Sequence, residues 1–222
     1  MDANKINFCN SSGFAIQNNR IKSDIINKIM NKYRVNINQY EKSYNDSFIP
    51  IMKKFNMFAT LITRGKKYIL YLTKINNENI SLLIEASTQN GVYPKIIAVP
   101  LSIKDDMFNE TIFIGEMLLY NQNWTFIIDD CRVNKGYTTY NKEPLDIVKL
   151  CNDFINNKFI PNRLEPFDIK VKKFFSISNI KHELNYNKLP LIGIQFIGLK
   201  NRIVFYFNSQ NYNNENNTIN LL

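Results

Sequence analysis

Between residues 57 and 207 the apolar residues come in short runs that are separated by turn-forming asparagine and glycine. Runs of this length that are rich in isoleucine, tyrosine and phenylalanine are typical of β-strands. Three of them, Phe58–Thr63, Tyr68–Lys74 and Ile80–Ala86, are joined by the short connections Arg64–Lys67 and Asn76–Asn79. This arrangement predicts an antiparallel meander, so the chain is expected to be built on antiparallel sheets.

The rest of the chain adds further strands and a few separated helices. Thr111–Tyr120 and Trp124–Asp129 are predicted to form a hairpin, and Leu191–Ile197 and Arg202–Phe207 a last strand pair. The other predicted strands are Lys95–Val99 and Asp168–Phe174, and the predicted helices are Asp24–Tyr33 with Ser23 as its cap, Pro144–Asn157 and Ser178–Glu183. Strands and helices do not alternate regularly and no phosphate-binding glycine loop is present, so the predicted fold class is α+β with mainly antiparallel sheets.

The sequence suggests three parts. Residues 1–56 are expected to be an N-terminal extension that carries the helix over 24–33, and residues 1–20, which are polar, are expected to be loose. Residues 57–207 are the predicted domain. Residues 208–222 are rich in asparagine and are predicted to be a disordered tail.

The charge of the chain favours an anionic partner. Its formal net charge of +9 fits RNA, DNA or a nucleotide. The three cysteines have no short spacing and there is one histidine, so neither a zinc site nor any other cofactor is expected, and a reducing compartment fits best. No apolar run approaches the roughly 20 residues that span a bilayer, and residues 1–5 have no apolar core of the kind found in a signal peptide, so we expect a cytoplasmic protein without a membrane partner.

Three stretches carry a family signal when they are read in order: Phe113–Leu119 running into Trp124–Asp130, Pro166–Phe175, and Leu191–Phe196. Together they resemble the nucleotidyltransferase domain of mRNA capping guanylyltransferases and DNA ligases. The resemblance covers about residues 55–207 and implies a cleft that holds a guanosine nucleotide. The excess of asparagine, isoleucine and lysine, which AT-rich coding yields, suggests a large DNA virus or an AT-rich parasite as the source, and the resemblance favours the virus.

The resemblance also implies that the chemistry of the family has been lost. Enzymes of this family attack the α-phosphate of the nucleotide with the lysine of a Lys-x-Asp-Gly motif. Gly65 matches the glycine of that motif and Lys67 a basic residue that follows it, whereas Ile62 replaces the lysine and Arg64 the aspartate. Isoleucine has no nucleophilic atom. An active enzyme that uses Lys66 or Lys67 instead is the alternative.

The resemblance further implies which side chains contact a ligand. Glu116 matches an acidic residue that contacts a ribose or a metal ion, and Trp124, the only tryptophan, can stack on a base. The structural alternatives are an exposed strand edge for Glu116, a core position for Trp124 and a solvated strand face for the lysines. The candidate ligand-binding residues are Phe58, Lys66, Lys67, Tyr68, Glu85, Glu116, Trp124, Lys170, Lys172 and Lys173.

Three functions follow from this interpretation. The leading hypothesis is non-catalytic binding of an mRNA 5′ cap, a guanosine nucleotide or an RNA 5′ end in viral translation initiation or mRNA processing, similar to the cap-binding domain of snurportin. The second is an active mRNA guanylyltransferase-like enzyme. The third is a structural subunit of a viral transcription, capping or particle complex. Protein partners in such a complex, and a location in the host cytoplasm, are further expectations.

Overall fold

The computed structural model describes residues 3–36, 42–43, 57–86, 93–187, 189–198 and 202–207. The chain forms two compact units. The first unit combines Met1–Gln39 with Gly65–Val171, and the second combines Tyr40–Arg64 with Lys172–Leu222. The division therefore does not follow the expected boundary at residue 57, because the N-terminal residues belong to the same unit as the middle of the chain.

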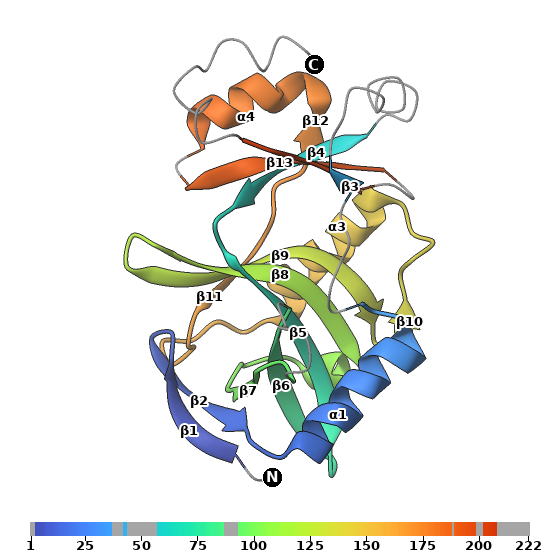
Figure 1. The fold of residues 1–222 in the computed structure, drawn as a ribbon, viewed down its shortest axis with the longest axis vertical. Coiled ribbons are helices and arrows are strands. Elements are labelled where there is room, and N and C mark those ends of the chain that lie inside the picture. Colours follow the sequence, from blue (N-terminus) through green and yellow to red (C-terminus); the bar gives the residue numbers. More distant parts are fainter. Residues whose placement is uncertain are drawn as a thin grey trace. The chain divides into compact units, whose positions relative to one another are not determined.

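The first unit is built on a nine-stranded, mainly antiparallel sheet (Figure 1). Its strands follow the order β1-β2-β7-β6-β5-β8-β9-β10, and β11 pairs with β9 in parallel. The strands are β1 Ala3–Phe8, β2 Ser11–Ile16, β5 Lys66–Ile75, β6 Glu78–Glu85, β7 Ile96–Val99, β8 Thr111–Tyr120, β9 Asn123–Asn134, β10 Tyr137–Thr138 and β11 Asp168–Val171. The antiparallel pairs β5–β6 and β8–β9 are the hairpins that the sequence predicts.

The two α-helices of this unit begin with different N-terminal signals. Asn18 caps the first helix by accepting hydrogen bonds from the backbone N–H groups of Arg20 and Ile21, so the helix begins before the expected cap at Ser23. Pro144 opens α3 as predicted, at a position where its missing N–H costs no hydrogen bond. The helical segments are α1 Asn19–Asn27, its π-helical continuation η1 Lys28–Lys32, the 3-10 helix η3 Asp105–Phe108, α3 Pro144–Asp153 and the π-helix η4 Phe154–Lys158. In the part of the chain that the structure describes, no helix has both the length and the apolar character needed to span a bilayer.

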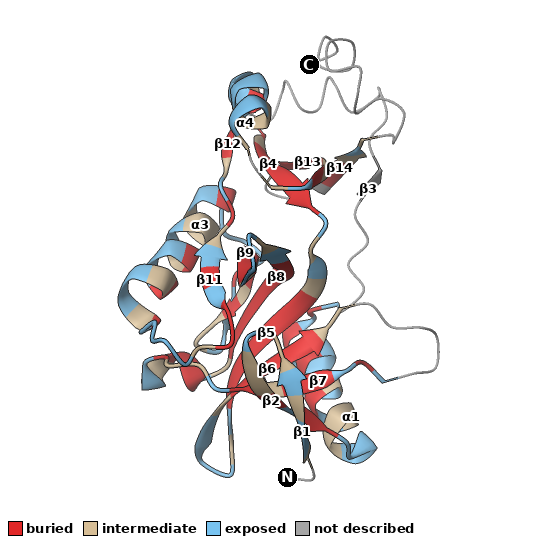
Figure 2. Ribbon diagram, turned by 90° about the vertical axis from the view of Figure 1, so that its left-hand side faces the viewer, coloured by how far each residue is buried: buried red, intermediate tan, exposed pale blue. Residues whose placement is uncertain are grey.

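Apolar side chains cover both faces of the nine-stranded sheet, and Figure 2 shows its central strands largely buried. On one face Phe113 packs against Phe154, with 4.5 Å between their ring centroids. On the other face Ile29 of η1 packs in the same cluster as Ile69 and Tyr71 of β5. Strand β8 shows the consequence most clearly, because its first eight residues are all buried.

The second unit is built on a five-stranded sheet in the order β12-β4-β13-β14-β3. Its core includes Ala59, Phe175, Ile180 and Phe196. Its elements are β3 Lys42–Ser43, β4 Phe58–Thr63, β12 Phe175–Ser176, the 3-10 helix η5 Ile177–Asn179, α4 Ile180–Tyr186, β13 Leu191–Ile197 and β14 Arg202–Tyr206. The predicted last strand pair is confirmed as β13 and β14.

The predicted α+β class with mainly antiparallel sheets is confirmed, but the predicted meander is wrong at its first turn. Strand β4 does not pair with β5. It pairs with β12 on one side and with β13 on the other, both of them more than 100 residues later in the chain. Local periodicity predicts that a segment is a strand but does not reveal a distant partner, which is why the error arose.

The N-terminal residues are more ordered than predicted. Residues 3–16 form the hairpin of β1 and β2, and β2 continues into the sheet by pairing with β7. Backbone hydrogen bonds to a neighbouring strand need no apolar side chains, so the polar composition of this segment concealed the two strands. Strand β11 also ends at Val171 instead of Phe174. The predicted disordered tail, residues 208–222, lies outside the described residues.

A half-buried carboxylate fastens helix η1 to the sheet. Glu110 precedes β8 and accepts hydrogen bonds from Lys28 Nζ at 2.7 Å and Thr73 Oγ1 at 2.7 Å. The hydroxyls of Tyr71 and Tyr33 also donate to its Oε2 atom, the latter at 3.3 Å. Burial raises the pKa of the Glu110 carboxyl, but the hydrogen bonds from Lys28, Tyr71 and Thr73 outweigh it, and the net pKa is lowered.

Replacement of Glu110→Gln should therefore lower the free energy of unfolding by about 1–3 kcal/mol at pH 7, measured by urea denaturation. The Glu110 pKa is lower in the folded chain than in the unfolded chain, so this contribution is complete above the unfolded pKa. It is lost as the pH falls through the folded pKa. The difference in free energy of unfolding between wild type and Glu110→Gln should therefore become smaller as the pH falls through the folded pKa of Glu110. Exposed Glu143, whose side chain caps no backbone N–H of α3, provides the control E143Q. If the loss of unfolding free energy in Glu110→Gln were the same at every pH, the ionised carboxylate of Glu110 would not be the stabilising group.

Candidate functional site

The start of β5 brings a lysine against two buried carboxylates. Lys67 lies opposite Glu116 of β8 in the strand register. Its Nζ is 2.8 Å from Oδ2 of Asp129 on β9 and 3.9 Å from Oε2 of Glu116. The Glu116 side chain is fully buried, whereas 38% of the Lys67 side chain is exposed. The lysine therefore supplies positive charge to carboxylates that water does not reach, which offsets the cost of burying them.

Two irregularities interrupt the regular pairing of β8 with β9, one between Ile112 and Phe113 and one between Ile114 and Gly115. The register shifts between Ile114 and Gly115, so that Gly115 faces Ile128, Ile114 faces Asp130 and Asp129 is the extra residue. Such β-bulges redirect side chains from their regular alternation. Nε of Arg132 then lies 2.7 Å from Oδ2 of buried Asp130.

Two glycines close to Glu116 are required by close packing. A Cβ atom on Gly65 would lie 2.8 Å from Cβ of Glu116. A Cβ atom on Gly115 would lie 2.3 Å from the backbone oxygen of Ile127, which no side-chain movement can relieve. In this structure Glu116 packs directly on Gly65, so the space beside the glycine that matches the family motif is occupied by a side chain of the protein.

A second charged pair lies next to the first. Lys66 Nζ is 2.7 Å from Oε1 of Glu85, and it is 5.9 Å from the centroid of the Tyr68 ring. Tyr68 itself is a core residue with 5% exposure. Burial and, to a lesser degree, the charge of Glu85 raise the pKa of the Tyr68 hydroxyl to about 12. The ring is thus a packing element of the sheet and not an open stacking surface in this conformation.

At the start of β5 the structure places Lys66, Tyr68 and Glu85 on one face of the sheet and Lys67 with Glu116 on the opposite face. The other candidates lie elsewhere. Phe58 is half-buried in β4 of the second unit. In the same unit Lys172 is buried, and Lys173 forms an ion pair with Glu183 at 2.7 Å. Lys170 is exposed on β11 of the first unit. Ile62, which the resemblance aligns with the nucleophile, is buried in β4 opposite Gly193.

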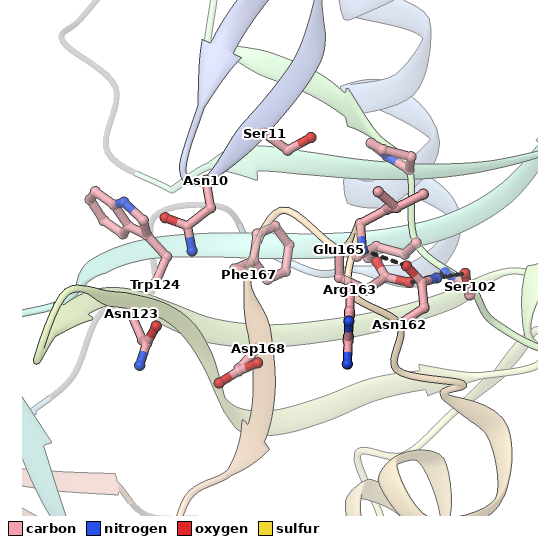
Figure 3. Close-up of a pocket in the computed structure, with 13 residues that line it drawn as sticks. Asn10, Ser11, Ser102, Asn123, Trp124, Asn162, Arg163, Glu165, Phe167 and Asp168 are labelled. Carbon is pink, nitrogen blue, oxygen red and sulfur yellow. Dashed lines mark hydrogen bonds between the residues drawn. The ribbon is translucent and has the colours of Figure 1, made fainter.

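Trp124 lies at a pocket of about 930 Å³ in the first unit (Figure 3). The pocket is enclosed by the β1–β2 turn, the residues after β7, the start of β9 and the loop that precedes β11. Phe167, which is buried, forms part of its wall. Its polar lining residues are Asn10, Ser11, Ser102, Asn123, Asn162, Arg163, Glu165 and Asp168. Of these, none was a candidate in the sequence.

Hydrogen bonds fix two walls of this pocket. The backbone N–H of Asn10 donates to the backbone oxygen of Pro166 at 3.1 Å, which joins the β1–β2 turn to the loop before β11. Glu165 Oε1 accepts from the backbone N–H of Ser102 at 2.8 Å and from Asn162 Nδ2 at 3.0 Å, which joins the same loop to the segment after β7. The pocket is therefore preformed, as ligand sites usually are.

The chain matches no known family model, and no curated protein matches it in sequence. Among the described residues, no group of three or more histidine, cysteine, aspartate or glutamate side chains is arranged so that it could hold a metal ion.

The two neighbouring lysines at the start of β5 should differ strongly in their effect on stability. Lys67→Met removes the cation between buried Asp129 and Glu116, and we expect the free energy of unfolding to fall by about 3 kcal/mol. Lys66→Met removes a surface partner of Glu85 and should cost at most about 1 kcal/mol. Urea denaturation of both variants at pH 7 tests this difference. Equal losses would show that the Lys67 ion pair has no special role.

Proposed function

We propose that this chain binds the 5′ end of RNA, an mRNA cap or a guanosine nucleotide, without catalysing nucleotidyl transfer, in the translation initiation or mRNA processing of a large DNA virus. The observation that carries the proposal is that Trp124 lies at a preformed polar pocket of about 930 Å³. Volumes of 300–1,000 Å³ are typical of small-ligand sites, and a nucleotide fits this range.

The chemistry of the pocket suits a base with its ribose and phosphates. Trp124 is half-buried and packs against the core cluster that contains Phe126 and Phe167. An indole ring stacks on any base and gains roughly 1–3 kcal/mol per base. The amides of Asn10 and Asn123 can donate and accept hydrogen bonds at a base edge, and Arg163 can contact phosphate.

The overall charge supports the same class of ligand. With a net charge of +9 the chain attracts polyanions, and the binding free energy should depend strongly on salt. Lys170 and Arg163 are both exposed, and neither forms an ion pair with any residue that the structure describes. Cations that are not already paired can contact the phosphates that follow the first nucleotide.

The absence of catalysis is proposed from the surroundings of the lysines. Covalent nucleotidyl transfer needs a neutral amine that reaches the α-phosphate. Ile62 occupies the position of the nucleophile, and its side chain is buried. Nζ of Lys67 lies 2.8 Å from Asp129 and 3.9 Å from Glu116, and Nζ of Lys66 lies 2.7 Å from Glu85, so acidic side chains of the protein already hold both amines. Neither lysine is therefore prepared to attack phosphorus.

Fluorescence of Trp124 tests the binding directly, because the chain has one tryptophan. Addition of a methylated cap analogue, of GTP or of a short RNA with a 5′ triphosphate should quench the emission in a saturable manner. Binding of labelled RNA, measured by anisotropy, should weaken by about 5- to 150-fold in Trp124→Leu. Tyr137→Leu removes an aromatic side chain that is 79% exposed and lies outside the pocket, and it should bind as the wild type does. No response to millimolar ligand, or co-purification with a protein partner in its place, would favour a structural subunit.

Incubation with radiolabelled GTP or ATP, followed by a denaturing gel, tests the lack of catalysis. We expect no covalently labelled band with either nucleotide, with or without added Mg²⁺. A band that disappears in Lys67→Met but persists in Lys66→Met would instead identify Lys67 as a relocated nucleophile. Such a result would establish the enzyme and overturn the non-catalytic proposal.

A further inference from the structure

We propose that a row of lysines beside the pocket binds the phosphates of an RNA strand whose first nucleotide occupies the pocket. This inference rests on the proposed function and extends the ligand from a nucleotide to a short RNA. The row consists of Lys104, Lys158 and Lys135, which all belong to the first unit. It begins where the segment after β7 and the segment after η4 run side by side, and both of these segments also line the pocket.

A short antiparallel pairing leads from the pocket to the row. The backbone N–H of Ile160 donates to the backbone oxygen of Ser102 at 2.8 Å, and the backbone N–H of Lys104 donates to the backbone oxygen of Lys158 at 2.9 Å. Ser102 therefore lies opposite Ile160, and Lys104 lies opposite Lys158. Residues two apart in an extended segment are about 7 Å apart along the chain. The two lysines thus lie one step beyond the pocket wall that Ser102 forms.

The side chains of this pairing show that Lys104 and the pocket share one surface. The middle residues of the pairing, Ile103 and Phe159, are both buried in the core of the unit. Side chains of an extended segment point alternately to opposite sides, so Ser102 and Lys104, which flank Ile103, both point away from that core. This direction agrees with the place of Ser102 in the pocket wall and with the exposure of Lys104. Lys104 forms no ion pair with any residue that the structure describes.

Asp106 brings a third lysine to the same place. Nζ of Lys158 and Nζ of Lys135 both lie 2.7 Å from Oδ2 of Asp106, so the two amines are separated by no more than twice this distance. Their hydrogen bonds lower the pKa of the Asp106 carboxyl to about 2, and the carboxylate is therefore ionised at neutral pH. Each ammonium group has three N–H donors, and among the described residues only Asp106 accepts from them. The other donors remain for the oxygens of a phosphate.

Two more aspartates lie near the row and limit its positive charge. Asp105 accepts a hydrogen bond from Nδ2 of Asn79 at 2.9 Å, at the turn between β5 and β6. Asp153, whose charge acts on Lys158, accepts a hydrogen bond from Nδ2 of Asn157 at 2.7 Å. An RNA strand is therefore expected to gain a moderate share of its binding free energy from each lysine, and the pocket remains the main site.

The pocket gives the strand its direction. Figure 3 shows Trp124 toward one end of the pocket, and Ser102 with Asn162 toward the other. A strand whose first base stacks on Trp124 and which then follows the pocket leaves it at the Ser102 end, where the row begins. Lysines contact phosphates and not base edges, so the row adds affinity without selecting a sequence.

The test compares GTP, measured by the quenching of Trp124, with a six-nucleotide single-stranded RNA that carries a 5′ triphosphate, measured by anisotropy. Wild type should bind the RNA at least about tenfold more tightly than GTP. Lys104→Gln and Lys158→Gln should each weaken RNA binding by about 3- to 10-fold, lower the slope of log K against log salt by about 0.7, and leave GTP affinity within about twofold of the wild-type value. Lys158→Arg keeps the charge and should bind the RNA as the wild type does.

Lys22→Gln is the matched control, because it removes the same charge from α1, the helix that packs on the other face of the sheet. It should change the affinity for neither ligand. Circular dichroism and thermal unfolding of each variant confirm that it is folded. Equal losses of RNA affinity in Lys22→Gln and Lys104→Gln would show that the net charge of the whole chain attracts the RNA, and that the position of Lys104 is unimportant.

The outcomes separate this inference from the function on which it rests. If the RNA binds no more tightly than GTP, or if Lys104→Gln and Lys158→Gln keep full RNA affinity, the row does not bind phosphates, although nucleotide binding in the pocket stands. If decaglutamate binds more tightly than the RNA, the row is a docking surface for an acidic protein and the RNA assignment is wrong. If neither GTP nor the RNA quenches Trp124 in the wild type, the proposed function itself fails.

Discussion

The burial of β8 on both faces is the constraint from which the rest of the first unit follows. Eight consecutive residues of this strand are inaccessible, and Glu116 is among them. A carboxylate in that position is tolerated only with a cation beside it, and Lys67 of the adjacent strand provides that cation. Gly65 and Gly115 then have to be glycines, because the glutamate and the bulged neighbour β9 approach too closely for any side chain. The features that suggested a nucleotidyltransferase cleft thus have a structural role in their own right.

The proposed binding site lies where the elements end. Its residues come from the tip of the β1–β2 hairpin, the first residues of β9 and the loop that leads into β11. Strand ends and loops can change their side chains at little cost to the core, whereas the strand interiors cannot. The sheet behind the pocket is closely packed, and rings such as Phe126 and Phe167 hold the strand that carries Trp124. A rigid support with exposed polar groups at its rim is well suited to recognition of a small ligand.

The sequence predicted individual strands more reliably than it predicted their partners. Runs such as 58–63, 111–120 and 191–197 are buried on both sides, and their apolar character marks their ends clearly. Strands β1 and β2 carry few apolar residues, so composition concealed them, although Ile16 is buried and Phe8 packs against the core once the strands have paired. For the site, Trp124 could be recognised as the single tryptophan, but Asn10 and Asp168 could not. Both line the pocket because the β1–β2 turn and the segment that leads into β11 lie close to the start of β9, an arrangement that a local pattern does not encode.

The pairing of β4 has a consequence for how the chain is made. This strand leaves the ribosome early, yet β12, which pairs with one of its edges, is synthesised about 110 residues later, which corresponds to roughly 5–20 s of translation. Throughout that interval a run of buried-type residues, Ala59 to Thr63, has two unpaired edges that neighbouring nascent chains could join. Completion of the first unit's sheet in the meantime does not protect it, since β4 has no partner there. In a heterologous host, the yield of folded protein and its dependence on chaperones should therefore change more with the rate at which residues 65–175 are translated than with the free energy of unfolding of the folded protein.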